Sequence, residues 1–206
     1  GMSVLLDVLA YNTHYLGFNA NMLANEMFLD SASLRSSIVS HSKTLGYVPS
    51  SARAAKATVD VTLNTNDSTA TMPAGTVFNT TVDDVSFQFS TIQSFTKSNT
   101  GNSIPFVGVD IFEGTFITTR YTVDTSDIDQ RFLLTDNRAD TSTLIVKVQT
   151  SSTDSTSTTF TEATDITQVT AGSNVFFLQE VEAGLFEVYF GDGVIGTALS
   201  DDNIVI

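Results

Sequence analysis

The sequence predicts an α+β protein in which an N-terminal helical hairpin precedes a mostly antiparallel, β-rich region. Hydrophobic residues repeat with a helical period up to about residue 50, and from Ala57 they alternate with polar residues, as in strands. Beyond residue 50, Thr-rich and aromatic segments separated by turn signals continue to the end of the chain. We therefore expect a helical domain at 1–50 and an acidic β-rich region at 51–206, and a further break near 101–114 stays open.

The first predicted helix runs from Leu5 to Leu29 and carries hydrophobic residues on two faces. Positions in the first seam are separated by alternating steps of three and four, and the second seam lies roughly opposite. The first seam consists of Leu6, Leu9, Thr13, Leu16, Ala20, Leu23 and Met27. The second seam consists of Val8, Tyr11, Tyr15, Phe18, Met22 and Leu29.

A helix on a protein surface needs only one hydrophobic face. This helix is therefore either buried in the core of its own domain or shared with a partner. Gly17 costs about 1 kcal/mol of helix propensity relative to Ala, which indicates close packing beside the first seam. In the partner interpretation, the candidate interface consists of Tyr11, Tyr15, Phe18 and Met22.

A second, shorter helix is expected after Asp30–Ser33, whose polar side chains can cap its free N–H groups. Its hydrophobic stripe consists of Leu34, Ile38 and Leu45. His41 and Lys43 lie in the last turn, where positive charge complements the helix dipole. Gly46 and Pro49 then end the helix. The two helices together form the predicted hairpin.

The remaining segments read as strands joined by turns. Strands are expected at 57–63, 85–89, 115–123, 143–149, 175–178 and 185–190. Gly191-Asp192-Gly193 is interpreted as a hairpin turn between 185–190 and 194–199. The Ser/Thr-rich segment 150–159 is interpreted as a mobile hairpin tip.

The net charge of −14 lies almost entirely in the β-rich region. Residues 1–57 carry four basic and three acidic side chains, or +1, and the rest of the chain carries five basic and twenty acidic, or −15. Such a field repels nucleic acid and anionic membranes, so neither is an expected partner. No membrane-spanning run or signal peptide is recognised in the sequence. Gly1 before Met2 and the hydrophobic run at Ile206 suggest a fragment.

A catalytic or metal site is not predicted, and neither is a cofactor. Cysteine is absent, and His14 and His41, the two histidines, both lie on helices. Asp124, Asp127 and Asp129 could hold Ca²⁺, but they lack the glycine and closing glutamate of an EF-hand loop. An exposed acidic turn is the preferred interpretation of these three residues.

Four segments resemble a known family. The run from Leu5 to Ala55 closely resembles the baseplate wedge subunit of T-even-type contractile-tailed phages, within the wider baseplate J-like family. The same family's motifs are similar to Met72–Phe78 (MPAGTVF), Glu113–Thr115 (EGT) and Phe186–Gly196 (FEVYFGDGVIG). Pro-Ala-Gly-Thr and Glu-Gly-Thr are weak signals alone, whereas the first and last segments are specific.

The resemblance implies a structural protein and not an enzyme. Family members dimerise and link neighbouring wedges into a ring around the tail hub, contacting other wedge subunits and the sheath-initiating proteins. The implied location is the tail baseplate of the virion, assembled in the host cytoplasm. The family supplies neither catalytic residues nor a cofactor to carry over.

Two other classes of function remain as alternatives. An acidic β-rich binding module, such as an adhesin or carbohydrate-binding head of a phage tail, would present exposed aromatic side chains, for which only Tyr121 and Tyr189 are candidates beyond residue 50. It could also use Asp124, Asp127 and Asp129 to bind Ca²⁺. A lysozyme-like tail hydrolase would need a pair of carboxylates in a cleft, which the spacing of acidic residues does not indicate.

Overall fold

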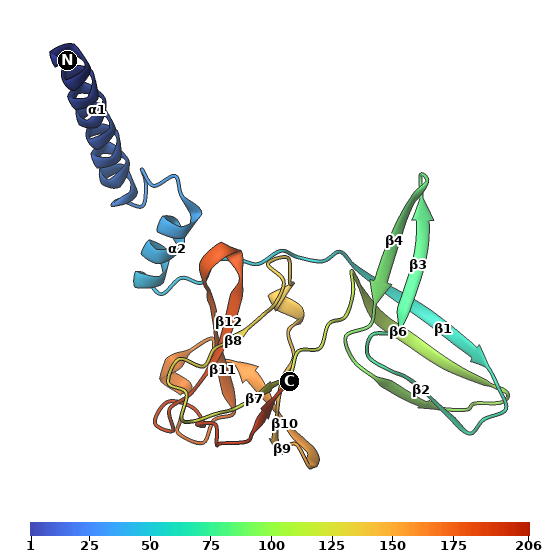
Figure 1. Ribbon diagram of the computed structural model, residues 1–206. Helices are drawn as coiled ribbons and strands as arrows, with labels where there is room; N and C mark the ends of the chain where they lie inside the picture. Colours follow the sequence, from blue (N-terminus) through green and yellow to red (C-terminus); the bar gives the residue numbers. More distant parts are fainter.

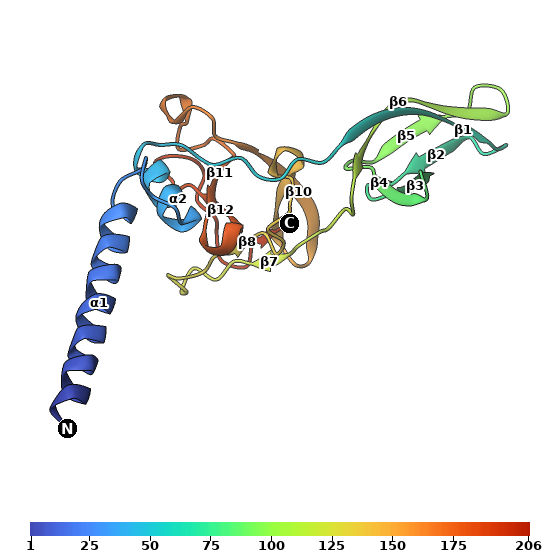
Figure 2. The same cartoon turned by 90° about the horizontal axis from the view of Figure 1, so that it is seen from above.

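The computed structural model describes residues 1–206, except for the side chain of Glu182. It confirms the α+β prediction, with helices at the N-terminus followed by mostly antiparallel strands. The molecule is elongated (Figures 1 and 2). We refer to residues 1–48 as the arm, to 56–113 as the first β unit and to 121–206 as the second β unit. The second β unit lies between the other two parts (Figure 1).

The arm contains α1 (Met2–Glu26) and α2 (Arg35–Thr44), joined by a short bent segment. The predicted end of α2 is confirmed: Gly46 has a φ of 74°, and the Gly46 and Tyr47 amides donate to the carbonyls of Lys43 and Ser42. This pattern is a Schellman motif. The two helices do not lie side by side, because α1 projects away from the body of the molecule (Figures 1 and 2).

The first β unit encloses its core between two antiparallel sheets. The larger sheet has the order β1-β6-β4-β3, and the smaller sheet pairs β2 with β5. The strands are β1 (Lys56–Asn64), β2 (Thr69–Met72), β3 (Val77–Val82), β4 (Val85–Ser90), β5 (Phe95–Ser98) and β6 (Ser103–Glu113). The buried residues of the core are Met72, Ile104, Phe106, Val109 and Ile111.

Strand β6 was missed by the sequence analysis and occupies the range considered for a break, 101–114. Pro105 and Gly108 interrupt the strand pattern in its sequence, because proline and glycine are unusual within strands. Gly108 lies in a β-bulge opposite Asp60, with a φ of 69°. The Asp60 carboxylate accepts the Gly108 amide at 2.7 Å and so satisfies a donor that the bulge removes from the ladder.

The second β unit is one strongly curved sheet with the order β7-β13-β9-β10-β11-β12-β8. Tyr121 on β7 and Phe132 on β8 belong to opposite edges of this sheet, yet their rings lie 5.7 Å apart and the Tyr121 hydroxyl donates to the Leu133 carbonyl. The sheet therefore curls until its two edges meet. Its strands are β7 (Tyr121–Thr122), β8 (Phe132–Leu133), β9 (Val146–Ser151), β10 (Asp154–Glu162), β11 (Val175–Glu180), β12 (Phe186–Phe190) and β13 (Ile204–Val205).

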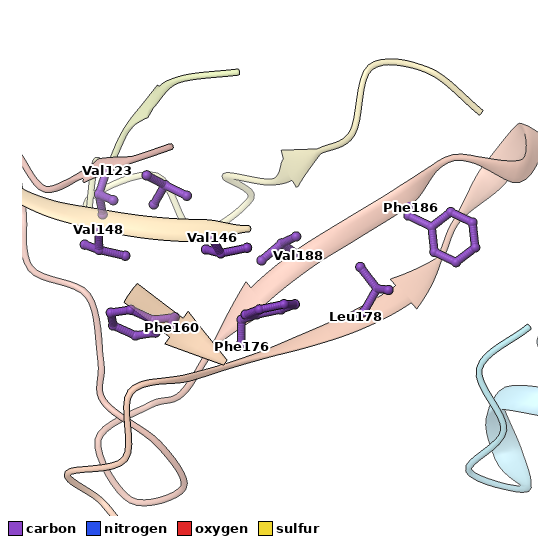
Figure 3. Close-up of a cluster of buried hydrophobic side chains, with 9 residues drawn as sticks. Val123, Val146, Val148, Phe160, Phe176, Leu178, Phe186 and Val188 are labelled. Carbon is purple, nitrogen blue, oxygen red and sulfur yellow. The ribbon is translucent and has the colours of Figure 1, made fainter. Parts of the chain in front are cut away.

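The core of the second β unit consists of side chains from the concave face of this sheet, drawn in Figure 3. Strands β11 and β12 supply alternate residues, Phe176 and Leu178 from one and Phe186 and Val188 from the other. The short helical turns η1 (Thr141–Thr143), η2 (Ile166–Gln168) and η3 (Glu182–Gly184) connect the strands.

Three expectations for the β-rich region need correction. Of the expected strand 115–123, only Tyr121–Thr122 is paired, because the residues before it connect the two β units. Residues 194–199 do not pair with β12, since the Asp192 carboxylate accepts the Val194 and Ile195 amides and folds them into a loop. The Ser/Thr-rich segment does form a hairpin, but its turn is limited to Ser152–Thr153 and most of it lies in strands.

The first β unit is an insertion between two parts that contact each other. Its ends meet where the Glu113 amide donates to the Ala55 carbonyl. The segment before it runs along the second β unit, where Ser51 Oγ accepts the Thr141 amide and the Asp140 carboxylate accepts the Ala54 amide. The arm is thus anchored to the second β unit and not to the unit that follows it in sequence.

Candidate interaction surface

The most conspicuous surface of the molecule is α1 itself. All side chains of this helix are described, and none is buried. Every hydrophobic residue of both seams within α1 is exposed, so the core-helix interpretation is wrong for this chain. Large exposed hydrophobic patches of this kind mark interaction sites. The chain's own β units cover neither seam.

The four predicted interface residues lie together along one face of α1. Tyr11 and Tyr15 are 71% and 54% exposed, and their rings stack with centroids 6.3 Å apart. Phe18 and Met22 continue the same stripe toward the second helix and are also exposed. A Cβ on Gly17 would meet no atom of the described chain within 4 Å, so the close approach inferred for Gly17 is not made within the molecule.

The corner between α1 and α2 is built on the Glu26 carboxylate. Oε1 accepts the Ser33 amide at 2.9 Å and the Ser33 hydroxyl at 2.7 Å, and Oε2 accepts the Leu34 amide at 3.2 Å. The expected caps from Asp30, Ser31 or Ser33 are therefore wrong: the N-cap residue is Leu34, and a carboxylate from the preceding helix accepts its amide, one of the donors that the helix leaves free. His41 Nε2 lies 2.9 Å from the Glu26 carbonyl and joins the two helix ends.

Glu26→Gln should loosen this corner. Hydrogen bonds from the Ser33 hydroxyl and amide lower the pKa of Glu26 from 4.5 to about 2. Because the folded-state pKa is depressed, the stabilisation is present above pH 4.5 and is lost as the pH falls toward 2. We expect the substitution to accelerate hydrogen exchange at Ser33 and Leu34 at neutral pH. The wild-type protein should approach the variant's rates near pH 2, and equal rates at pH 7 would contradict this role.

An ion pair fixes the arm to the second β unit. Arg35, the first residue of α2, donates from Nε and Nη2 to the two carboxylate oxygens of Glu180 at 2.7 and 2.8 Å. The Glu180 residue is only 1% exposed, whereas the Arg35 side chain is 64% exposed. The carboxylate raises the pKa of the Arg35 guanidinium through this hydrogen bonding. Val39 of α2 is also buried.

A second bidentate pair lies on the neighbouring strand. Arg131 Nε and Nη2 each lie 2.9 Å from a carboxylate oxygen of Glu187, and Gln179 donates to the same carboxylate. The hydrogen bonds from Arg131 keep the pKa of Glu187 below its usual value. Sequence reasoning missed both pairs. The available signal was a pair of glutamates, Glu180 and Glu187, at otherwise hydrophobic strand positions.

The other candidate residues do not form a site. No cluster of three metal-binding side chains occurs in the part of the chain that the structure describes. The Asp124 carboxylate accepts the Ser126 amide and hydroxyl, and the Asp127 carboxylate accepts the Asp129 amide, so these acids shape their own turn. His14 is exposed on α1.

The two aromatic residues considered for glycan binding are engaged in packing. Tyr121 closes the curved sheet against Phe132, and the Tyr189 ring stacks on Phe177 with centroids 5.2 Å apart. A shallow hollow of about 340 Å³ lies beside the Arg35–Glu180 pair, lined by Ser50, Ser51, Ala52, Asn137, Ala183, Gly184 and Phe186. Within the described residues, neither helix has the length and hydrophobicity to cross a membrane.

Comparisons with known proteins match this chain to baseplate wedge proteins. Residues 1–47, which contain both helices, match the model of the helical domain of gp6-like baseplate wedge proteins. Baseplate wedge protein gp6 of Enterobacteria phage T4 is 26% identical over 205 residues, which is 97% of this chain and 30% of that protein. The chain thus spans about a third of the length of the curated relative. Both matches confirm the predicted resemblance to a baseplate wedge protein.

Proposed function

We propose that this chain is a structural part of a phage tail baseplate wedge and that α1 is its main assembly element. The single observation that carries the proposal is the exposure of both hydrophobic seams of α1. A helix with two uncovered hydrophobic faces is stable in water only as part of a larger bundle. The match of the helical domain to residues 1–47 supports the same role.

The proposed contacts are protein–protein contacts that join wedges into a ring around the hub. One seam, with Tyr11, Tyr15, Phe18 and Met22, pairs with a second copy or with another wedge subunit. Sheath-initiating proteins are further proposed partners. The acidic β units disfavour nucleic acid and membranes as partners. The role is structural and not enzymatic, and the location is the virion's tail baseplate after assembly in the host cytoplasm.

We also propose that residues 1–50 form a helical domain and residues 51–206 the β-rich region. The separate cores of the two β units support a further division of that region. In this organisation the arm reaches toward neighbouring subunits while the β units carry the acidic surface.

Tyr15→Asp tests the assembly role. The substitution places a charge in the centre of the exposed seam, so we expect self-association, measured by light scattering, to be lost. Because Tyr15 is 54% exposed and α1 has no buried residue, the thermal unfolding of the β units should not change. Asn19→Asp, on the polar edge of the same helix, is the matched control and should associate like the wild type. A dimer that survives Tyr15→Asp would contradict the interface.

A further inference from the structure

Strand β3 is an open edge of the larger sheet in the first β unit. It is the last strand in the order β1-β6-β4-β3, and five of its six residues are exposed. The pairs Phe78–Phe89, Thr80–Phe87 and Val82–Val85 flank a two-residue turn at Asp83–Asp84. In such a hairpin these pairs are hydrogen-bonded to each other, and the backbone groups of Asn79 and Thr81 between them point away from β4.

The β3–β4 hairpin also projects beyond the sheet that supports it. Strand β6 pairs with β4 only at Phe89 and Ser90, so the outer half of the hairpin is a two-stranded ribbon (Figure 1). A ribbon of two strands is marginally stable in water, and a third strand stabilises it. Phe78 and Phe89 pack into the core at its base, and Phe87, Val82 and Val85 extend the same hydrophobic face outward.

The other edge of the sheet is protected. Strand β1 carries charged residues: Asp60 faces the bulge of β6 at Gly108, and Lys56 forms a 2.8 Å ion pair with Asp110. Bulges and charges are the usual means by which edges avoid pairing with other chains. The six residues of β3, Val-Phe-Asn-Thr-Thr-Val, contain neither a charge nor a proline, and the ladder of β3 with β4 is continuous. This edge is therefore suited to accept a strand.

The charge of the hairpin defines the kind of strand that it would accept. Asp83 and Asp84 are its only charged residues, and both occupy the turn with positive φ values of 49° and 63°. A second copy would bring its own acidic hairpin and a net charge of −14 to the contact. A segment with Lys or Arg beside the turn is attracted instead.

We propose that β3 is a docking edge for an extended segment of another protein subunit. The segment pairs with the backbone of Asn79 and Thr81, places alternate hydrophobic side chains over Val82 and Phe87, and carries a basic residue next to Asp83–Asp84. This inference rests on the proposed baseplate role and adds a second contact, distant from α1 (Figure 2).

Hydrogen exchange in the isolated protein and in assembled baseplates tests the proposal. The Asn79 and Thr81 amides should exchange rapidly in the free protein and at least about tenfold more slowly in baseplates, because each gains a backbone hydrogen bond. Equal rates in the two states would overturn the docking edge while leaving the assembly role of α1 intact. If the protein is absent from baseplates, the proposed function itself fails. Protection in the free, self-associated protein would identify a second copy as the occupant and overturn the heterologous pairing.

Two sets of variants separate the backbone contact from the charge contact. Asn79→Pro removes an outward N–H that the hairpin does not use, and Asn79→Ala keeps it. We expect only the proline variant to enter baseplates severalfold less efficiently, with slow exchange at Thr80 verifying that its hairpin remains.

Asp83→Asn with Asp84→Gly removes the charge but suits the positive φ of the turn. It should slow association and reduce its salt dependence, and an unchanged salt dependence would overturn the basic character of the partner.

Discussion

Phe186→Ala is expected to lower the free energy of unfolding of the second β unit by about 3–5 kcal/mol. Phe186 is 2% exposed and lies opposite Glu180 on the neighbouring strand, within the cluster drawn in Figure 3. Removing its ring leaves a cavity in the core that β11 and β12 line and takes away the packing beside the Arg35–Glu180 pair. Tyrosine fluorescence during urea denaturation measures the change, because Tyr121 and Tyr189 both belong to this unit.

Ile104→Ala is the matched control in the first β unit, where Ile104 is 0% exposed. Its expected cost is also large, about 2–5 kcal/mol. The first β unit contains no tyrosine, so circular dichroism should report its loss of stability while the tyrosine transition stays in place. If both substitutions shift the tyrosine transition equally, the two β units unfold as one cooperative domain, and the division of the β-rich region is wrong.

Arg35→Ala is expected to destabilise the attachment of the arm by about 1–3 kcal/mol, because it leaves the buried Glu180 carboxylate without its partner. Hydrogen exchange in α2 measures the effect. Adding Glu180→Gln should restore part of the loss, since the neutral amide is less costly to bury. Arg138→Ala breaks an exposed pair with Asp136 and should cost less than about 1 kcal/mol. Equal effects of Arg35→Ala and Arg138→Ala would contradict the anchoring role.

The periodicity of hydrophobic residues predicted the elements in which this pattern is not interrupted. The long helix and the strands around 57–63, 85–89 and 175–178 follow directly from side-chain spacing, and the end of α2 follows from the glycine at position 46. Strand β6 was missed because Pro105 and the bulge at Gly108 interrupt its alternation. Strand β13 was missed because two paired residues are too few to produce a pattern.

The helical face that carries the candidate residues follows from the sequence, whereas the contacts that hold the arm in place do not. Spacing alone places Tyr11, Tyr15, Phe18 and Met22 on one helical face, but whether a face is buried depends on the rest of the fold. The partners Arg35 and Glu180 are 145 residues apart, and nothing in the local sequence of either residue identifies the other. The same limit applies to Glu26, because its role as a cap depends on the bend between the helices.

The separation between Arg35 and Glu180 has a consequence for synthesis on the ribosome. Arg35 leaves the ribosome before Glu180, and its anchor exists only after 145 more residues have been added. At roughly 5–20 residues per second, the interval lasts about 7–30 s. During that time α1 presents its two hydrophobic seams to water on an unanchored arm. Any contact that α1 makes in this interval is therefore made before the second β unit has completed its fold.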